Sequence, residues 1–208
     1  FIGKPCDIQG LKLFLDAFPK YKSRFRFTIA IFCAGIPSYN ATDRLIKEAN
    51  NNTAPISVKY RGDGWPGYFK VNFADGGEYK AKYTYAWGEV LGRDVCYRCK
   101  ICPDGIGIEA DISVGDAWNS ADGYPTFEEN EGHSFVLVRT QKAVSVVGRT
   151  FENNILYGDL LDIGKISRMQ PYQYLRRISV AYKLIPISFL TWPLFRFNKI
   201  ECLKLSKS

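Results

Sequence analysis

The chain has 208 residues, of which 46% are hydrophobic and 24% are charged, and its formal net charge is +7 at pH 7. This composition is that of a globular protein and argues against disordered and low-complexity classes, and the length suits one domain with an appendage. The single histidine, His133, argues against a histidine-rich zinc site.

The first part of the sequence predicts a strand, a helix, a second strand and a second helix. Residues 1–3 have the pattern of the end of a buried strand. Asp7 can cap a helix that runs to about Phe18 with apolar residues at helical spacing. The nearly continuous apolar run 25–32 is typical of a strand covered on both faces. Residues 42–49 predict a short helix.

The middle of the sequence predicts a β-meander. Apolar and polar residues alternate over 56–60 and 69–73, and a turn at Asp75-Gly-Gly77 leads into a strand at 79–85. Two more strands are predicted at 111–114 and 134–139, and helices at 140–153, 159–167 and 173–184.

This order of elements predicts a mixed α/β (α+β) fold, with a mixed sheet, flanking helices, a β-meander and a cysteine-rich loop. We expect residues 1–165 to form the cysteine-bearing domain and residues 166–208 to form a basic, partly apolar C-terminal appendage.

The positive charge is concentrated at the C-terminal end. Residues 165–208 carry nine basic residues and one acidic residue, a charge of +8, which leaves −1 for the residues before them. A neutral body argues against nucleic-acid binding. The apolar stretch 184–197 contains two prolines and is shorter than the about 20 residues that a spanning helix needs. It either contacts an anionic membrane surface peripherally or packs on the body, and we favour packing.

Cysteine spacing is the strongest chemical signal in the sequence. Six cysteines lie at positions 6, 33, 96, 99, 102 and 202. The run Cys96-Tyr-Arg-Cys99-Lys-Ile-Cys102 suits metal ligation better than disulfides and indicates a reducing, cytoplasmic location. Cys6 and Cys33 each follow a predicted strand, where they could add ligands from distant parts of the sequence. Thiolates select zinc or an iron–sulfur cluster, and scattered buried thiols are the third alternative. Cys202 is predicted to take no part.

Six motifs in order resemble one known family. They are Gly3-Lys-Pro-Cys6, Phe32-Cys-Ala-Gly35, Tyr60-Arg-Gly-Asp-Gly-Trp65, Cys96-Tyr-Arg-Cys99-Lys, Ala110-Asp-Ile-Ser-Val-Gly-Asp-Ala-Trp118 and Ser134-Phe-Val-Leu-Val-Arg-Thr140. Together they resemble the C-terminal domain of the coenzyme F-420 hydrogenase/dehydrogenase beta-subunit family. That family includes formate dehydrogenase beta subunits and 7-hydroxymethyl chlorophyll a reductase. The resemblance covers roughly residues 1–185.

The resemblance implies an iron–sulfur flavoprotein oxidoreductase. In this family, electrons pass through a 4Fe–4S cluster to FAD, which exchanges a hydride with a substrate or with coenzyme F-420. By resemblance, Cys6 and Cys33 would ligate the cluster with two of Cys96, Cys99 and Cys102. The redox partner would be a ferredoxin or a hydrogenase or dehydrogenase subunit, and some relatives accompany polysaccharide biosynthesis.

The chain also looks incomplete. It begins at Phe1, its only methionine is Met169, and nothing in it matches the family's upstream half, which carries a glycine-rich flavin segment. We therefore expect a fragment that needs the missing N-terminal half to bind FAD.

Further residues are candidates for contact with the flavin or the substrate. Basic side chains favour an anionic reduced flavin, a glycine admits a close approach of backbone to cofactor, and carboxylates can orient a ligand. The candidates are Lys4, Arg61, Trp65, Asp111, Gly115 and Asp116. For each, the alternative is an ordinary turn or a solvated side chain.

Two other functions compete with the redox interpretation. One is a structural or accessory protein of a polysaccharide-assembly pathway that binds zinc through four cysteines. The other is a flavin-independent sugar transferase, which no nucleotide-binding loop or carboxylate cluster in the sequence supports.

Overall fold

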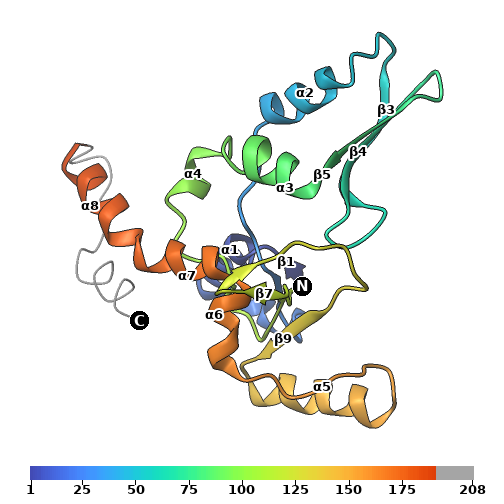
Figure 1. The fold of residues 1–208 in the computed structure, drawn as a ribbon. Coiled ribbons are helices and arrows are strands. Elements are labelled where there is room, and N and C mark those ends of the chain that lie inside the picture. Colours follow the sequence, from blue (N-terminus) through green and yellow to red (C-terminus); the bar gives the residue numbers. More distant parts are fainter. Residues whose placement is uncertain (191–208) are drawn as a thin grey trace. The chain divides into compact units, whose positions relative to one another are not determined.

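The computed structural model describes residues 1–190. These residues form two compact units (Figure 1). The first, here called the sheet unit, comprises Phe1–Cys33, Cys102–Ala117 and the chain from Ser134 onward. The second, the meander unit, comprises Ala34–Ile101 and Trp118–His133. Each unit is therefore assembled from segments that are distant in the sequence.

The sheet unit contains a four-stranded sheet in the order β1-β2-β6-β9. Its strands are β1 (Ile2–Gly3), β2 (Ile29–Ile31), β6 (Ile112–Asp116) and β9 (Ser134–Val138). β1, β2 and β6 run parallel, with Ile2 opposite Ile29 and Ile29 opposite Ile112, and β9 pairs antiparallel with β6. Because parallel strands end at the same edge, the segments that follow these three strands start from one edge of the sheet. We call it the carboxyl edge.

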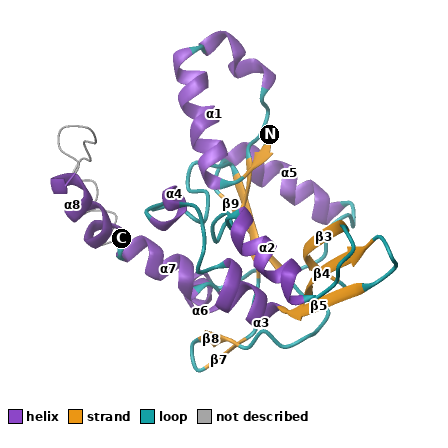
Figure 2. Ribbon diagram, turned by 90° about the horizontal axis from the view of Figure 1, so that it is seen from above, coloured by secondary structure: helices purple, strands orange, loops and turns teal. Residues whose placement is uncertain are grey.

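Helices follow the strands of this sheet. α1 (Pro5–Ala17) begins directly after β1, and its Ile8 side chain is buried against Ala30 of β2 and Ala110. α5 (Gln141–Glu152) follows β9 (Figure 2). The other helical segments are η1 (Pro19–Arg24), η3 (Ile163–Lys165), α6 (Ile166–Met169), α7 (Pro171–Ile178) and α8 (Val180–Leu190).

The meander unit is built on a second sheet. β3 (Pro55–Gly62), β4 (Tyr68–Phe73) and β5 (Glu78–Lys82) form an antiparallel sheet in chain order (Figure 2). The Asp75-Gly-Gly77 turn joins β4 to β5, and the Gly77 N–H donates to the Asp75 carboxylate at 2.9 Å. The remaining elements are α2 (Tyr39–Glu48), α3 (Tyr83–Tyr85), η2 (Ala86–Leu91), α4 (Tyr97–Lys100), β7 (Ser120–Ala121) and β8 (Tyr124–Pro125).

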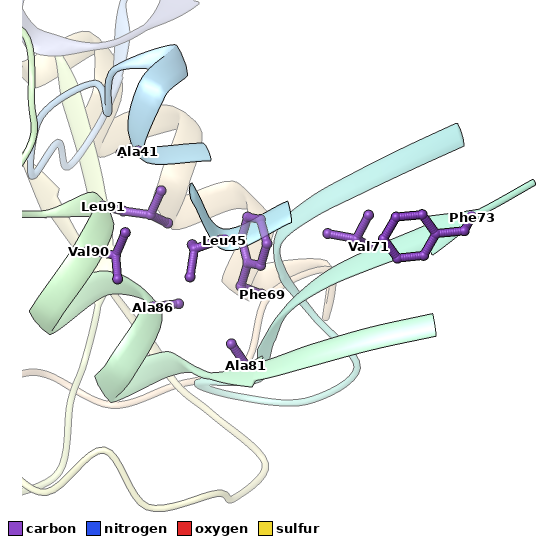
Figure 3. Packing of buried hydrophobic residues seen from close by; sticks show 9 residues of the cluster. All are labelled: Ala41, Leu45, Phe69, Val71, Phe73, Ala81, Ala86, Val90 and Leu91. Atoms are coloured by element: carbon purple, nitrogen blue, oxygen red, sulfur yellow. The ribbon is translucent and has the colours of Figure 1, made fainter. Parts of the chain in front are cut away.

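The core of the meander unit lies between β4 and the helices α2 and η2 (Figure 3). Phe69, Val71 and Phe73 alternate along β4 with polar residues and are buried. Ala41 and Leu45 are four residues apart and so share one face of α2. That face is buried against the apolar side chains of β4. Burying a Leu or Phe side chain stabilises a fold by about 1.5–3 kcal/mol, so this cluster accounts for the unit's compactness.

The predicted fold class is confirmed: the structure has a mixed sheet with flanking helices and a β-meander. The predicted strand at 25–32 is shorter in the structure. That apolar run forms only β2, in which Ala30 is buried and Ile31 is exposed. A continuous apolar run has no period, and so it does not reveal how many of its residues pair.

The C-terminal helices also differ from the prediction. The helix expected at 173–184 is two helices, α7 and α8, and the helix expected at 159–167 is reduced to η3 and α6. Among residues 1–190 no helix is both long and apolar enough to cross a membrane. Cys202 and much of the basic, apolar tail lie outside the described residues.

Candidate functional site

Two of the predicted metal ligands lie at the carboxyl edge of the sheet unit. β1 ends at Gly3, and Cys6 follows in the first turn of α1. β2 ends at Ile31, and Cys33 follows it. Because β1 and β2 are paired parallel neighbours, their thiol-bearing segments start side by side.

Lys4 joins β1 to α1 and stands two residues before Cys6. Its ammonium donates to the Asp7 carboxylate at 2.7 Å, and its backbone N–H donates to the same carboxylate at 2.9 Å. The hydrogen bond with Asp7 raises the pKa of Lys4, and the negative charge of the Asp7 carboxylate raises it further. The structure therefore places a positive charge at the carboxyl edge, directly after β1.

The loop that contains Cys102 is connected to Cys33. The Cys33 N–H donates to the Gly105 carbonyl at 2.9 Å, and the Cys102 thiol donates to the Asp104 carbonyl at 3.2 Å. The Asp104 carboxylate fixes the turn by accepting backbone N–H groups within 3.2 Å from Ile106, Gly107 and Ile108. Cys33 and Cys102 thus belong to adjoining segments of one unit.

Buried polar groups support this loop from within the sheet unit. The buried Ser113 hydroxyl donates to the Gly107 carbonyl at 3.1 Å and accepts from the Arg139 guanidinium at 2.6 Å. Burial lowers the pKa of Arg139, and the nearby negative charge of Asp104 opposes that shift. A satisfied buried hydrogen bond rigidifies its surroundings, so the loop has a defined conformation.

Cys96 and Cys99 belong to the meander unit. Cys96 precedes α4, and its N–H donates to the Ile36 carbonyl at 2.9 Å. The Ile36 N–H donates to the Cys99 sulfur at 3.5 Å. Backbone N–H groups directed at sulfur are one of the ways in which proteins tune iron–sulfur clusters.

The five described cysteines belong to two units. None of the five described cysteines forms a disulfide; Cys6 and Cys96 are exposed and the other three are half-buried. Within residues 1–190 the structure gathers no three cysteine, histidine or carboxylate side chains closely enough to hold a metal ion. The sheet unit supplies Cys6, Cys33 and Cys102, and the meander unit supplies Cys96 and Cys99. The donor set has the chemistry of zinc or iron–sulfur ligation.

Asp111 lies at the other end of β6 from the carboxyl edge. Its buried carboxylate accepts from the Thr28 N–H at 2.9 Å, the Thr28 hydroxyl at 3.1 Å and the Thr140 hydroxyl at 2.8 Å, and it pairs with Lys142 at 3.0 Å. These contacts connect the starts of β2, β6 and α5. They favour a structural role over contact with a ligand at the carboxyl edge.

Gly115 and Asp116 lie at the carboxyl edge, at the end of β6. A Cβ on Gly115 would come within 2.8 Å of the Phe32 ring and 2.9 Å of the Phe135 ring, so the close approach that this glycine permits is to two aromatic side chains. The Asp116 carbonyl accepts a hydrogen bond from Gln170 at 2.8 Å.

Arg61 and Trp65 belong to an aromatic cluster in the meander unit. The Trp65 ring stacks on Trp118, with ring centroids 4.4 Å apart. The Arg61 guanidinium lies over the Trp118 ring at 5.2 Å and over the Tyr83 ring at 5.5 Å. Cation–π contacts of this kind hold an arginine in place and stabilise its position.

The Glu129 carboxylate holds the Trp65 loop and was not predicted from the sequence. It accepts the Trp65 N–H at 2.5 Å and the Gly67 N–H at 3.3 Å. Glu129 stands in the acidic run 128–131, which gives no sign that one carboxylate binds a loop more than 60 residues earlier.

Comparison with known proteins places the chain in a family. A family model for the C terminus of the beta subunit of coenzyme F420 hydrogenase/dehydrogenase matches residues 1–159. An uncharacterized protein of Methanocaldococcus jannaschii is 27% identical over 176 residues, which cover 81% of this chain and 43% of that protein. The chain thus spans less than half the length of that relative.

A solved structure has the same fold. A chain of the F420-reducing NiFe hydrogenase complex from Methanosarcina barkeri superposes with a TM-score of 0.54 at 15% identity, covering 88% of this chain and 60% of that one. Because the family model matches well over half of the sequence, this chain belongs to the coenzyme F420 hydrogenase/dehydrogenase beta-subunit family, whose C-terminal part it represents.

Proposed function

We propose that this chain is the cysteine-bearing part of an iron–sulfur flavoenzyme. The observation that carries the proposal is the pairing of β1 with β2, which starts the Cys6 and Cys33 segments side by side at one edge of a parallel sheet. In a member of this redox family, soft thiolate donors at a sheet edge suit a 4Fe–4S cluster, which four cysteines hold.

The proposed ligands are Cys6 and Cys33 with two of Cys96, Cys99 and Cys102. A cluster held by thiolates carries negative charge, and the Lys4 ammonium at the same edge would offset it. Asp7 keeps that ammonium in place through its hydrogen bond.

FAD is the second proposed cofactor. When bound, FAD supplies hydride exchange with a substrate or with coenzyme F-420. The residues proposed to contact it are Lys4, Arg61, Trp65 and Asp116. The contacts of Asp111 and Gly115 support a role in holding the sheet together instead. The chain spans 43% of the length of its relative, and we propose that a part outside this chain completes the flavin site.

The setting of the enzyme is also proposed. The partner would be a ferredoxin or a hydrogenase or dehydrogenase subunit, and the location a reducing cytoplasm, where thiols stay free. We propose residues 1–165 as the cofactor domain and 166–208 as an appendage. A role in polysaccharide biosynthesis and a peripheral membrane contact of the basic tail stay predictions.

Metal analysis tests the redox proposal. The 208-residue chain is purified anaerobically, incubated with iron and sulfide, and examined by visible absorption and by iron, sulfide and zinc analysis. We expect a brown protein with about four irons per chain. A colourless protein that retains one zinc per chain after the same treatment would support the four-cysteine zinc protein and overturn the proposal.

A further inference from the structure

We infer that helix α7 positions the cysteine ligands, because it donates hydrogen bonds to the Cys33 carbonyl and packs against Gly105 in the loop that follows Cys102. α7 spans Pro171–Ile178 and lies beyond residue 159, where the match to the family model ends.

The first contact is with the main chain of Cys33. The Cys33 carbonyl accepts a hydrogen bond from the Gln173 amide at 3.1 Å and a second from the Arg176 guanidinium at 3.2 Å. A carbonyl oxygen has two lone pairs, and here both have donors from one helix. Gln173 and Arg176 are three residues apart, a spacing that places them on the same side of α7. The backbone that carries the Cys33 thiol is therefore held from outside the sheet.

The second contact is with the loop of Cys102. The Gln173 side-chain oxygen is buried against Gly105, where a Cβ would come within 1.8 Å of it. Gly105 also accepts the Cys33 N–H through its carbonyl. The absence of a side chain at Gly105 thus lets α7 approach both thiol-bearing segments together.

A third contact fixes the start of α7. Gln170 is buried and precedes Pro171, and its amide donates to the Asp116 carbonyl at 2.8 Å. Asp116 ends β6, the neighbour of β2 in the sheet. Gln170, Gln173 and Arg176 therefore join α7 to the ends of two adjacent parallel strands.

These contacts hold the backbone of Cys33 in place before any cofactor binds. With its carbonyl and its N–H both bonded, Cys33 has a fixed backbone, and its thiol needs little rearrangement to act as a ligand. Gln173 and Arg176 are positioning residues, because they act through the Cys33 backbone. This inference rests on the proposed function only in treating Cys33 as a cluster ligand.

Hydrogen exchange on the metal-free chain tests the inference without relying on the cofactor. The variants are Gln173→Ala, Arg176→Ala and the double variant, and mass spectrometry follows peptides that contain the amides of residues 32–36 and 104–108. We expect about tenfold faster exchange there in the double variant, with β1 and β9 unchanged. Arg176→Lys keeps a cationic donor and should restore part of the protection. The matched controls are Arg168→Ala in α6 and Gln141→Ala in α5, both exposed residues.

The outcomes separate this inference from the proposed function. Unchanged exchange at 32–36 in the double variant, or an equal increase throughout the sheet, overturns the positioning role. If the wild-type chain takes up no iron but the exchange changes as expected, the proposed function fails and the positioning of Cys33 stands. If it takes up iron, the double variant should lose iron to a chelator several-fold faster than the controls.

Discussion

Asp111 and Thr28 are bonded to each other through both backbone and side chain. The Asp111 carboxylate accepts the Thr28 N–H at 2.9 Å, and the Asp111 N–H donates to the Thr28 hydroxyl at 3.0 Å. The two residues are 83 apart in the sequence, and they join the starts of β2 and β6. The parallel pairing that sets Cys33 at the carboxyl edge therefore depends on a contact at the opposite edge.

Replacing this carboxylate should weaken the sheet unit. Asp111→Asn leaves the Thr28 and Lys142 donors with a neutral partner, and we expect a loss of about 2 kcal/mol in the free energy of unfolding. Urea denaturation followed by far-ultraviolet circular dichroism measures it. The control is Asp122→Asn, an exposed residue of the meander unit, which should unfold at the wild-type urea concentration.

The same carboxylate should make stability depend on acid pH. Burial acts to raise the pKa of Asp111, but the hydrogen bonds from Thr28, Lys142 and Thr140 outweigh it and lower the pKa below the usual 3.8. A lowered pKa in the folded state gives stability that is fully present above the unfolded value and is lost as pH falls through the folded one. Wild-type stability should therefore fall below about pH 4 more steeply than that of Asp111→Asn. Parallel pH profiles of the two proteins would contradict this.

Gly115 should be intolerant of even one added methyl group. Its Cα faces the Phe32 and Phe135 rings, whose centroids are 5.0 Å apart. Gly115→Ala should lower the melting temperature and cost about 1–3 kcal/mol, because both rings must move. Gly148→Ala is the matched control, since a Cβ on that α5 glycine would meet nothing within 4 Å, and this variant should gain about 0.5–1 kcal/mol. If Gly115→Ala melts like the wild type, the Phe32 and Phe135 rings leave room for a methyl group at this position.

The Trp65 loop should depend on Glu129. Glu129→Ala removes the acceptor for the Trp65 and Gly67 N–H groups, so the stack of Trp65 on Trp118 should loosen. Near-ultraviolet circular dichroism, which reports on packed tryptophans, should lose intensity while the far-ultraviolet signal stays. The neighbouring Glu128→Ala should change neither signal, and an unchanged spectrum for Glu129→Ala would show that the stack holds without it.

Local patterns predict much of the fold. The alternation of apolar and polar residues in β4 and the turn at Asp75-Gly-Gly77 depend only on residues close in sequence. The structure has both. The run 25–32 predicts too long a strand, because its continuous apolarity does not say which residues pair; in the structure only Ile29–Ile31 do. The spacing of apolar residues therefore locates an element when one of its faces is buried, and it does not locate the ends of an element whose residues are all apolar.

The candidate site shows the same limit. That Cys6 and Cys33 follow strands could be predicted, because strand ends are marked by local sequence. The hydrogen bonds of Gln173 and Arg176 to the Cys33 carbonyl could not be predicted. The donors lie about 140 residues away, and every residue has a backbone carbonyl, so the sequence does not mark which one accepts. Likewise, the sequence makes Asp111 a candidate for ligand contact, and only its position at the far end of β6 argues against that role.

Tyr79 should ionise only at strongly alkaline pH. Burial raises the pKa of its hydroxyl, and the hydrogen bond to the Glu48 carboxylate at 2.8 Å raises it further. A raised pKa in the folded state gives stability that is present below the unfolded value of 10.0 and is lost as pH rises through the folded one. Glu48→Gln should lower this pKa, so phenolate absorbance should appear at lower pH. Tyr39→Phe is the control, because Tyr39 is an exposed residue of α2. This variant should leave the pH at which Tyr79 ionises unchanged.

Serine substitutions should identify the cysteine ligands one at a time. In the iron-reconstituted chain, Cys6→Ser and Cys33→Ser should each abolish most of the visible absorbance, because a cluster that keeps three thiolates is labile. Of Cys96→Ser, Cys99→Ser and Cys102→Ser, two should behave in the same way and one should keep full iron content. Cys202→Ser is the control and should match the wild type. Full iron content in Cys33→Ser would show that the end of β2 supplies no cluster ligand. Loss of iron in all three variants Cys96→Ser, Cys99→Ser and Cys102→Ser would show that each of these thiols is a ligand.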